Sequence, residues 1–374
     1  MASVRTRSTS PNRVPESRPS GRGTVGILAI TLQDLRFRAR QFLIAVIGAA
    51  LVFAMGLLLS GMAAGFSFEI DQTVQAMRAD AWVLAAGSPG RVAALPAMPA
   101  SSVAAVAREP GVTRADPVVV APQAAQVGPD SRSVVLIGTA PGGLGSAVVH
   151  TGHPVRGNGQ AVVDARLGVG IGGRFTVSGL HFTVVGTVVD GTLLAGEPNA
   201  YVTLHDAQAV LYGGRALIGA VLTSGTPAAA PVGMSVHTNA QIEAASLNQM
   251  APAVSSINNS RVFMWVIAAL LVAALVYVTA LERTRDFAVL KALGSSSGTL
   301  FVGLAVQAVL VALAAAAIAA LISNFMKGLF AQPVEIPTSA FVVLPLIALV
   351  VGILSSLAAL RRAVSVDPAV AFAG

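Results

Sequence analysis

Residues 41–68 read QFLIAVIGAALVFAMGLLLSGMAAGFSF, a run of 28 residues without a charged side chain, and this run decides the fold class. About 20 apolar residues are enough for a helix to cross the hydrocarbon core of a bilayer. Three more charge-free runs of sufficient length follow, at residues 262–281, 292–326 and 336–360. We therefore predict four transmembrane helices, at residues 42–65, 262–281, 300–323 and 340–360.

The composition of the whole chain agrees with this prediction. Hydrophobic residues make up 54% of the chain and charged residues 11%, whereas charged residues make up roughly a quarter of a typical soluble domain. The net charge of +7 comes almost entirely from residues 1–40, which hold eight arginines against two acidic residues. A net positive charge concentrated at one end of the chain argues against a nucleic-acid partner. Because cysteine is absent, disulfides and thiolate chemistry are excluded.

The positions of Lys and Arg predict how the chain is oriented. Short segments rich in these residues stay preferentially on the cytoplasmic side of a membrane. The N-terminal arm has eight of them, residues 282–291 have three and the tail at residues 361–374 has two, whereas the loop after the third span has Lys327 alone. We expect both termini and residues 282–299 in the cytoplasm, and residues 69–261 outside it. The Ala, Gly, Val and Arg bias suits a bacterial source, and the location is then the plasma membrane.

The first span has an alternative reading as a cleaved signal peptide, because a basic arm precedes the apolar run and small residues follow it. Signal-peptide cores run to about 7–15 residues, and the longer run of this chain favours a retained helix.

The segment before the first span has two readings. Leu28, Leu32, Leu35 and Ala39 recur at helical spacing, which predicts an amphipathic juxtamembrane helix at residues 25–41. A plain basic flank is the alternative. Residues 1–24 are rich in Ser, Pro and Arg, a composition typical of disorder.

Residues 69–261 carry strand and helix signals in alternation, which predicts an α+β domain. Residues 174–178 and 181–185 alternate polar and apolar side chains around Gly179, a hairpin pattern. The remaining elements are expected as a helix from Ser101 or Ser102 to about Arg108, strands at residues 200–204 and 217–222, and helices at residues 206–212 and 240–259.

The same domain offers no convincing catalytic site. His150 and His153 lack a third candidate ligand nearby. The glycines of residues 168–173 precede a strand, whereas a phosphate-binding loop precedes a helix. A G-x-S-x-G elbow is absent. A binding or mechanical domain is therefore expected, without metal or cofactor.

The loop after the second span carries the strongest functional pattern, ERTRDFAVLKALG at residues 282–294. Phe287, Leu290 and Leu293 share one face of a short helix, which Gly294 can terminate. An apolar face ringed by charge suits docking into a groove on a partner protein. A helix lying against lipid headgroups is the alternative.

This loop resembles the FtsX-like and MacB-type permeases, the membrane subunits of mechanotransmitting ABC transporters, which carry E-R-x-R-E-I-A-V-L-K-A-L-G after their second span. The residues that match, by identity or by a conservative change, and that the resemblance assigns to ATPase coupling are Glu282, Arg283, Arg285, Asp286, Phe287, Leu290, Lys291, Leu293 and Gly294. The family's A-x-x-x-D-P tail is matched by residues 363–371, where Asp367 and Pro368 suit a helix start.

The resemblance implies an α-helical membrane protein of four transmembrane helices, with an α+β extracytoplasmic domain between the first and second. It also implies a homodimer, for which Gly48 and Gly56 offer small contact surfaces in the first span, and a cytoplasmic ABC ATPase docked on the 282–294 segment. The chain has no G-x-x-x-x-G-K-[ST] motif. It is therefore expected not to be an enzyme, and ATP and Mg are expected on the partner ATPase.

Two functions fit this architecture. The first is a transporter subunit that exports or extracts a lipid, lipoprotein, peptide or drug, working with membrane lipid and an extracytoplasmic adaptor. The alternative is a regulatory protein of the FtsX type, whose outer domain activates a partner such as a cell-wall hydrolase.

Overall fold

The computed structural model describes residues 39–282, 289, 297–330 and 332–364. The expectations for the N-terminal arm, for most of residues 282–299 and for the end of the tail therefore lie outside the described residues. The chain divides into two compact units. One comprises Ala50–Ala268 with Ala316–Pro345, and the other comprises Met1–Ala49, Ala269–Ala315 and Leu346–Gly374.

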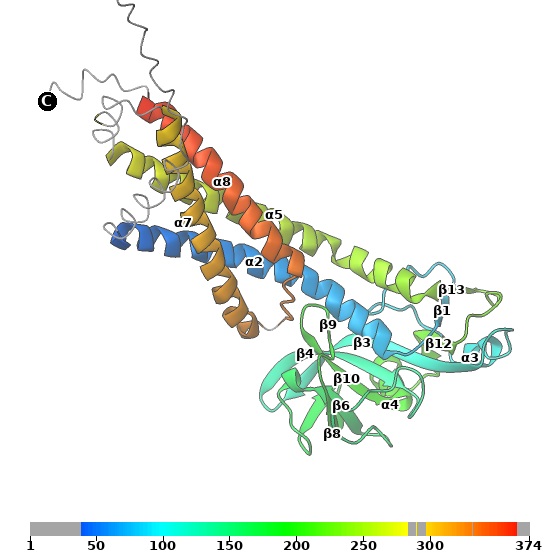
Figure 1. Ribbon diagram of the computed structural model, residues 1–374. Coiled ribbons are helices and arrows are strands. Elements are labelled where there is room, and N and C mark those ends of the chain that lie inside the picture. The colour runs from blue at the N-terminus through cyan, green and yellow to red at the C-terminus, as the bar shows by residue number, and fades with distance from the viewer. Residues whose placement is uncertain (1–38, 283–288, 290–296, 331, 365–374) are drawn as a thin grey trace, which may run out of the picture. The chain divides into compact units, whose positions relative to one another are not determined.

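Four helices in the described part of the chain are long and apolar enough to cross a membrane. They are α2 (Ala39–Ala76), α5 (Asn239–Glu282), α7 (Ser297–Met326) and α8 (Thr338–Val364), as labelled in Figure 1. At about 1.5 Å per residue, α2 and α5 are roughly 57 and 66 Å long, about twice the thickness of a hydrocarbon core. Both helices therefore extend well past the predicted spans at residues 42–65 and 262–281.

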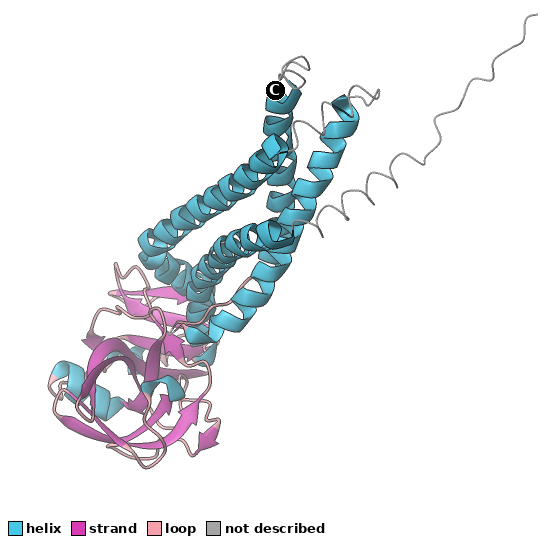
Figure 2. Cartoon of the chain, turned by 90° about the vertical axis from the view of Figure 1, so that its left-hand side faces the viewer, coloured by secondary structure: helices cyan, strands magenta, loops and turns pink. Residues whose placement is uncertain are grey.

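A β-rich domain lies between α2 and α5 in the sequence, and its strands are coloured magenta in Figure 2. Its helical elements are α3 (Ser102–Val106), η1 (Ala165–Leu167) and α4 (Leu204–Tyr212); the other short helix, η2 (Lys327–Leu329), follows α7. The strands are β1 (Ala81–Ala85), β2 (Met98–Pro99), β3 (Arg114–Val127), β4 (Asp130–Thr139), β5 (Thr151–Gly152), β6 (Gln160–Asp164), β7 (Arg174–Val177), β8 (Leu180–Val188), β9 (Thr192–Leu193), β10 (Glu197–Thr203), β11 (Leu217–Ile218), β12 (Ala220–Ser224) and β13 (Met234–Thr238).

The main sheet has the order β13-β1-β12-β3-β4-β10-β6-β8-β5. Most neighbours are antiparallel, but β4 with β10 and β6 with β8 are parallel. This mixed sheet with its short helices confirms the predicted α+β character of the domain. The first and last strands of the domain in the sequence, β1 and β13, pair directly with each other.

Local sequence signals explain several elements. The hairpin of β7 and β8 forms as predicted, with Ser178 and Gly179 both at positive φ in its two-residue turn. Helix α4 starts where the Thr203 hydroxyl accepts a hydrogen bond from the Asp206 amide. The strand predicted at residues 217–222 is divided at Gly219, because β11 pairs with β2 whereas β12 pairs with β1 and β3.

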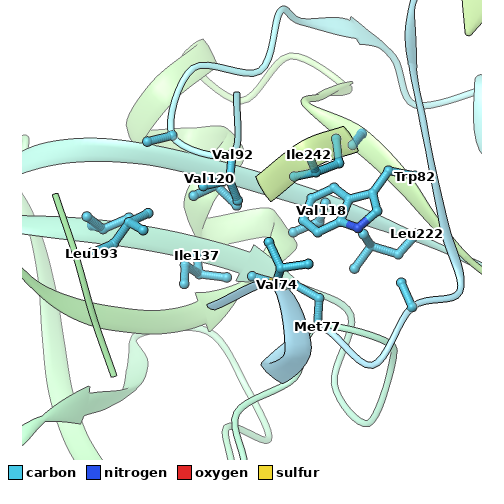
Figure 3. Close-up of a cluster of buried hydrophobic side chains, with 14 of the residues drawn as sticks. Val74, Met77, Trp82, Val92, Val118, Val120, Ile137, Leu193, Leu222 and Ile242 are labelled. Carbon is cyan, nitrogen blue, oxygen red and sulfur yellow. The ribbon is translucent and has the colours of Figure 1, made fainter. Parts of the chain in front are cut away.

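Hydrophobic side chains pack on both faces of the sheet. Along β3, Val118 and Val120 belong to one cluster and Val119 to the other, because successive side chains of a strand point to opposite faces. The first cluster, shown in Figure 3, includes Val74 from α2 and Ile242 from α5, both fully buried. The ends of two long apolar helices are therefore built into the core of the β-rich domain.

Glycines let α2 approach its neighbours closely. A Cβ atom placed on Gly56 would lie 2.7 Å from Nε1 of Trp265 on α5. A Cβ atom on Gly65 would collide with the carbonyl oxygen of Pro333. Gly56, which we expected at a dimer contact, thus faces a side chain of its own chain, whereas Gly48 has open space around it.

Replacing Phe175 by Ala tests the packing of the β7–β8 hairpin. The Phe175 ring is buried and stacks on Phe182 with 5.4 Å between centroids. Its truncation should lower the free energy of unfolding by about 3–5 kcal/mol. Thermal unfolding of the full chain in detergent measures this loss. Leu180→Ala, at a partly exposed position of the same hairpin, is the control and should change stability by about 0.5 kcal/mol. Equal melting temperatures for the two variants would contradict the packing.

Candidate coupling site

The coupling segment expected from the sequence lies almost entirely outside the described residues. Glu282 is the last residue of α5 and is exposed. The tail pair Asp367 and Pro368 lies outside the described residues. So do the other expected coupling residues, which are Arg283, Arg285, Asp286, Phe287, Leu290, Lys291, Leu293 and Gly294. Their role stays a prediction. The structure does describe how α2 and α5 are joined to the β-rich domain, and these contacts are the candidate site for coupling helix movement to the domain.

The first of these contacts joins α2 to the β9–β10 hairpin, and we call it the α2 clasp. It comprises Glu69 and Thr73 of α2 with residues 192–196. The Glu69 carboxylate accepts hydrogen bonds from the amides of Ala195 at 2.9 Å and Gly196 at 2.6 Å. The Thr73 hydroxyl donates to the carbonyl of Thr192 at 3.4 Å. Because hydrogen bonds to a charged acceptor are about twice as strong as neutral ones, Glu69 dominates the clasp.

The conformation of the hairpin explains why its amides reach Glu69. Leu194, Ala195 and Gly196 have φ values of 54°, 66° and 93°, in the left-handed region. Successive N–H groups in a turn can point into a concavity that suits an anion, and those of Ala195 and Gly196 both point at the Glu69 carboxylate. A left-handed conformation costs a non-glycine residue roughly 1–2 kcal/mol. The two hydrogen bonds to Glu69 offset that cost at Leu194 and Ala195.

The hairpin is also tied to the sheet. The Asp164 carboxylate, at the end of β6, accepts from the amides of Gly191 and Arg166, each at 2.9 Å. The Arg166 guanidinium donates to the Thr192 hydroxyl at 3.2 Å and lies 3.8 Å from the Asp190 carboxylate. The hairpin therefore bridges α2 and the sheet through hydrogen bonds on both sides.

The C-terminal end of α2 is held by the loop after β4. Met77 is fully buried, and its carbonyl accepts from the Gly145 amide at 2.8 Å. The Arg78 guanidinium donates to the carbonyls of Gly143 and Ser146 at 3.2 and 3.3 Å. The loop thus donates to the Met77 carbonyl and accepts from Arg78. These bonds fix the point at which the helix ends.

Helix α5 starts with a capping box. The Gln241 side chain accepts from the Thr238 amide at 2.9 Å, and the Thr238 hydroxyl accepts from the Gln241 amide at 3.3 Å. One turn further, Ser246 accepts from the Val92 amide at 3.0 Å. The start of α5 is therefore fixed by its own sequence and by a loop of the domain.

Asn239 joins the two helices. Its carboxamide accepts from the Trp82 indole at 2.8 Å and donates to the carbonyl of Ala79 at 2.9 Å. Ala79 follows α2 by three residues, and Trp82 lies on β1 with its side chain fully buried. The end of α2 and the start of α5 are thus held together inside one packed core.

Sequence reasoning did not single out these residues. Glu69 and Asp71 are the first acidic residues after the first apolar run, and a carboxylate at that position was the available signal. Its partners lie 126 and 127 residues away in the sequence. Within the described ranges, groups of three or more His, Asp or Glu side chains placed to hold a metal ion are absent.

The comparisons with known proteins cover nearly the whole chain. Residues 42–258 match the MacB-like periplasmic core domain, and residues 261–368 match the FtsX-like permease C-terminal domain. Two uncharacterized ABC transporter permeases of Mycobacterium tuberculosis are 37% and 34% identical to the chain over 348 residues, which cover 93% of this chain and 100% of each relative. A permease of Mycobacterium bovis is also 37% identical over the same coverage.

Two solved structures are similar to part of the chain. The periplasmic region of MacB from Actinobacillus actinomycetemcomitans has a TM-score of 0.34 and 13% identity, covering 47% of this chain and 96% of that one. The extracellular domain of the noncanonic ABC-type transporter YknZ from Gram-positive bacteria has a TM-score of 0.30 and 16% identity, covering 39% and 83%.

The fold and the matches define a class: a membrane protein with long apolar helices, two of which are built into an α+β domain. The chain belongs to the FtsX-like and MacB-like ABC transporter permease family.

Replacing Glu69 by Gln tests the α2 clasp. The amide has one acceptor oxygen and no charge, so one hairpin N–H loses its partner, at a cost of about 1.5–3 kcal/mol. Hydrogen exchange at the Ala195 and Gly196 amides of the full chain should become faster. Asp71→Asn is the control, because Asp71 accepts only an exposed hydrogen bond from Gln75 in the same helix. Unchanged exchange in the Glu69 variant would exclude the clasp.

Proposed function

We propose that this chain is the membrane subunit of an ABC transporter in which a separate cytoplasmic ATPase drives movements of the β-rich domain through α2 and α5. One observation carries the proposal: two helices long enough to cross a membrane end inside the core of that domain. A displacement along either helix acts directly on buried side chains such as Val74 and Ile242. Because a packed core deforms little, the domain should move with the helices.

The α2 clasp and the Asn239 contacts support this mechanical role. A helix held only by apolar contacts can slide or rotate, whereas directional hydrogen bonds resist both movements. Glu69 fixes α2 to the β9–β10 hairpin, and Asn239 fixes the start of α5 to Ala79 and Trp82. Both helices would therefore pass force to the same domain at defined points.

The proposed orientation has the β-rich domain outside the cytoplasm of a bacterial cell and both termini inside. The distribution of Lys and Arg supports this orientation. The match of residues 42–258 to a domain described as periplasmic agrees with it. The 282–294 segment is then available to the cytoplasmic ATPase, which binds ATP and Mg and carries out the hydrolysis.

Two copies of the chain would form the permease. The Trp265 side chain fills the space beside Gly56. A dimer contact on the first span would therefore use Gly48 and the exposed side chains near it, such as Leu51. The cargo class would be an amphiphile reached from the outer face of the membrane, such as a lipid, lipoprotein, peptide or drug. The alternative, activation of a cell-wall hydrolase, would use the same helices to move the same domain.

Replacing Leu293 by Asp tests the ATPase contact. Burial of a leucine side chain in a partner groove contributes about 1.5–3 kcal/mol, and a charge at that position removes this term. Co-purification of the cognate ATPase should be lost, and ATP turnover in reconstituted membranes should fall. Leu290→Asp should behave alike, whereas Arg283→Ala should cost less than about 1 kcal/mol as an exposed charge. Full recovery of the ATPase with the Leu293 variant would show that docking occurs elsewhere.

Single cysteines test the orientation, because the chain has none of its own. Cysteines replacing Ser131 on β4 and Ser224 on β12 should react with a membrane-impermeant thiol reagent in whole cells. A cysteine replacing Ser296 should react only after the cells are opened. The reverse pattern would overturn the proposed orientation without bearing on the ATPase contact.

A further inference from the structure

A cleft of about 370 Å³ lies beside the α2 clasp. The last turns of α2 line one side of it through Gln72, Thr73 and Ala76. The β-rich domain lines the remainder, with residues 148–150, which precede β5, and with residues from β8, from the loop before β9 and from β10. None of the α2 clasp residues except Thr73 lines this cleft, so it is a separate feature of the domain.

Asn199 is the unusual member of the lining. The residue is 1% exposed, and its side chain is hydrogen-bonded to that of Tyr201, whereas its carboxamide oxygen is buried without a hydrogen-bond partner. Its backbone is fixed, because the Asn199 amide donates to the carbonyl of Gly191 at 2.6 Å. Buried carbonyl oxygens in native proteins nearly always have a donor, so an orphaned one at a cleft points to a ligand that supplies the donor.

The neighbours of Asn199 add further acceptors. Tyr201, two residues along the same face of β10, lines the cleft and is almost fully buried. Burial raises the pKa of the Tyr201 hydroxyl to about 12, so it stays neutral, and it is hydrogen-bonded to the Asn199 side chain. Asp190 contributes a carboxylate whose side chain is 52% exposed and lies 3.8 Å from the Arg166 guanidinium. The described lining contains one acid, Asp190, and one exposed histidine, His150, and it lacks Lys and Arg.

Apolar surface lies next to these acceptors. Val148 and Val189 line the cleft, and they are 67% and 62% exposed. A ligand that covers an exposed valine side chain gains binding free energy of about 25 cal/mol for each Å² of apolar surface removed from water. The cleft thus presents hydrogen-bond acceptors beside two exposed apolar side chains.

We propose that this cleft binds a small amphiphilic amine, whose N–H groups donate to the carboxamide of Asn199 and whose apolar part covers Val148 and Val189. The Asp190 carboxylate, half-exposed beside Arg166, has an oxygen left to accept a hydrogen bond from the ammonium group of the ligand. A volume of about 370 Å³ suits a molecule of the size of a dipeptide amide. Such a ligand would contact α2 and the domain at once, and its binding does not depend on the ATPase.

The test uses the full chain in lipid nanodiscs with a single cysteine in place of Val189. Leucyl-leucinamide is the probe, because it carries an ammonium, amide donors and two apolar side chains. N-acetyl-leucyl-leucine is its matched control, with the same apolar groups but a blocked amine and a carboxylate. At twice its dissociation constant, the probe should slow the reaction of the cysteine with a neutral thiol reagent about threefold.

Further variants assign the effect to the cleft. A cysteine replacing Val232, which is fully exposed and does not line the cleft, should react at the same rate with and without probe. In the Val189→Cys chain, Asn199→Leu should weaken protection about tenfold because the acceptor is lost. Because this substitution also removes the hydrogen bond to the Tyr201 side chain, the melting temperature of the variant is measured alongside. Asn199→Asp keeps an acceptor and should retain protection.

The possible results separate cleanly. Protection by the dipeptide amide alone, lost in the Asn199→Leu variant, supports the proposal. Equal protection by both compounds would show an apolar surface without recognition of the amine, and would overturn it. Protection by neither compound would overturn it as well. If Asn199→Leu fails to fold, Asp190→Asn replaces it, and undiminished protection by the cationic probe in that variant would count against the proposal.

Discussion

The bond between the Trp82 indole and the Asn239 carboxamide is the interaction on which the rest of the domain depends. It joins the strand that follows α2 to the first residue of α5. Around it, β1 pairs with β13, and buried side chains from both helices complete the same cluster. Because the two ends of the domain meet there, neither helix can leave the core without breaking the sheet at β1.

The α2 clasp adds an electrostatic constraint to this apolar framework. A carboxylate is costly to bury unless its oxygens receive hydrogen bonds. Glu69 receives two of them from the amides of Ala195 and Gly196, in a hairpin loop whose residues have positive φ values. The hairpin in turn is tied to Asp164 and Arg166. Helix and sheet therefore stabilise an otherwise unfavourable backbone conformation. The hairpin in that conformation fixes the position of the helix relative to the sheet.

The sequence predicts some parts of this structure well and others not at all. Lipid requires long charge-free helices, and a two-residue turn at Ser178 and Gly179 requires a hairpin, so both follow from local pattern. The extent of α2 does not, because Glu69 and Asp71 end the charge-free run while the helix continues to Ala76. The α2 clasp joins residues more than 120 positions apart, and no local periodicity encodes such a contact.

The pairing of β1 with β13 has a consequence for how such a membrane protein can change. When the first and last strands of a domain are neighbours, the chain enters and leaves the domain at adjacent points. Such a domain is an insertion between two helices, here called a cassette. Loops elsewhere in the cassette, including those that line the cleft beside α2, can lengthen or vary without disturbing these two junctions. One membrane framework can therefore carry domains with different surfaces while its junctions stay the same.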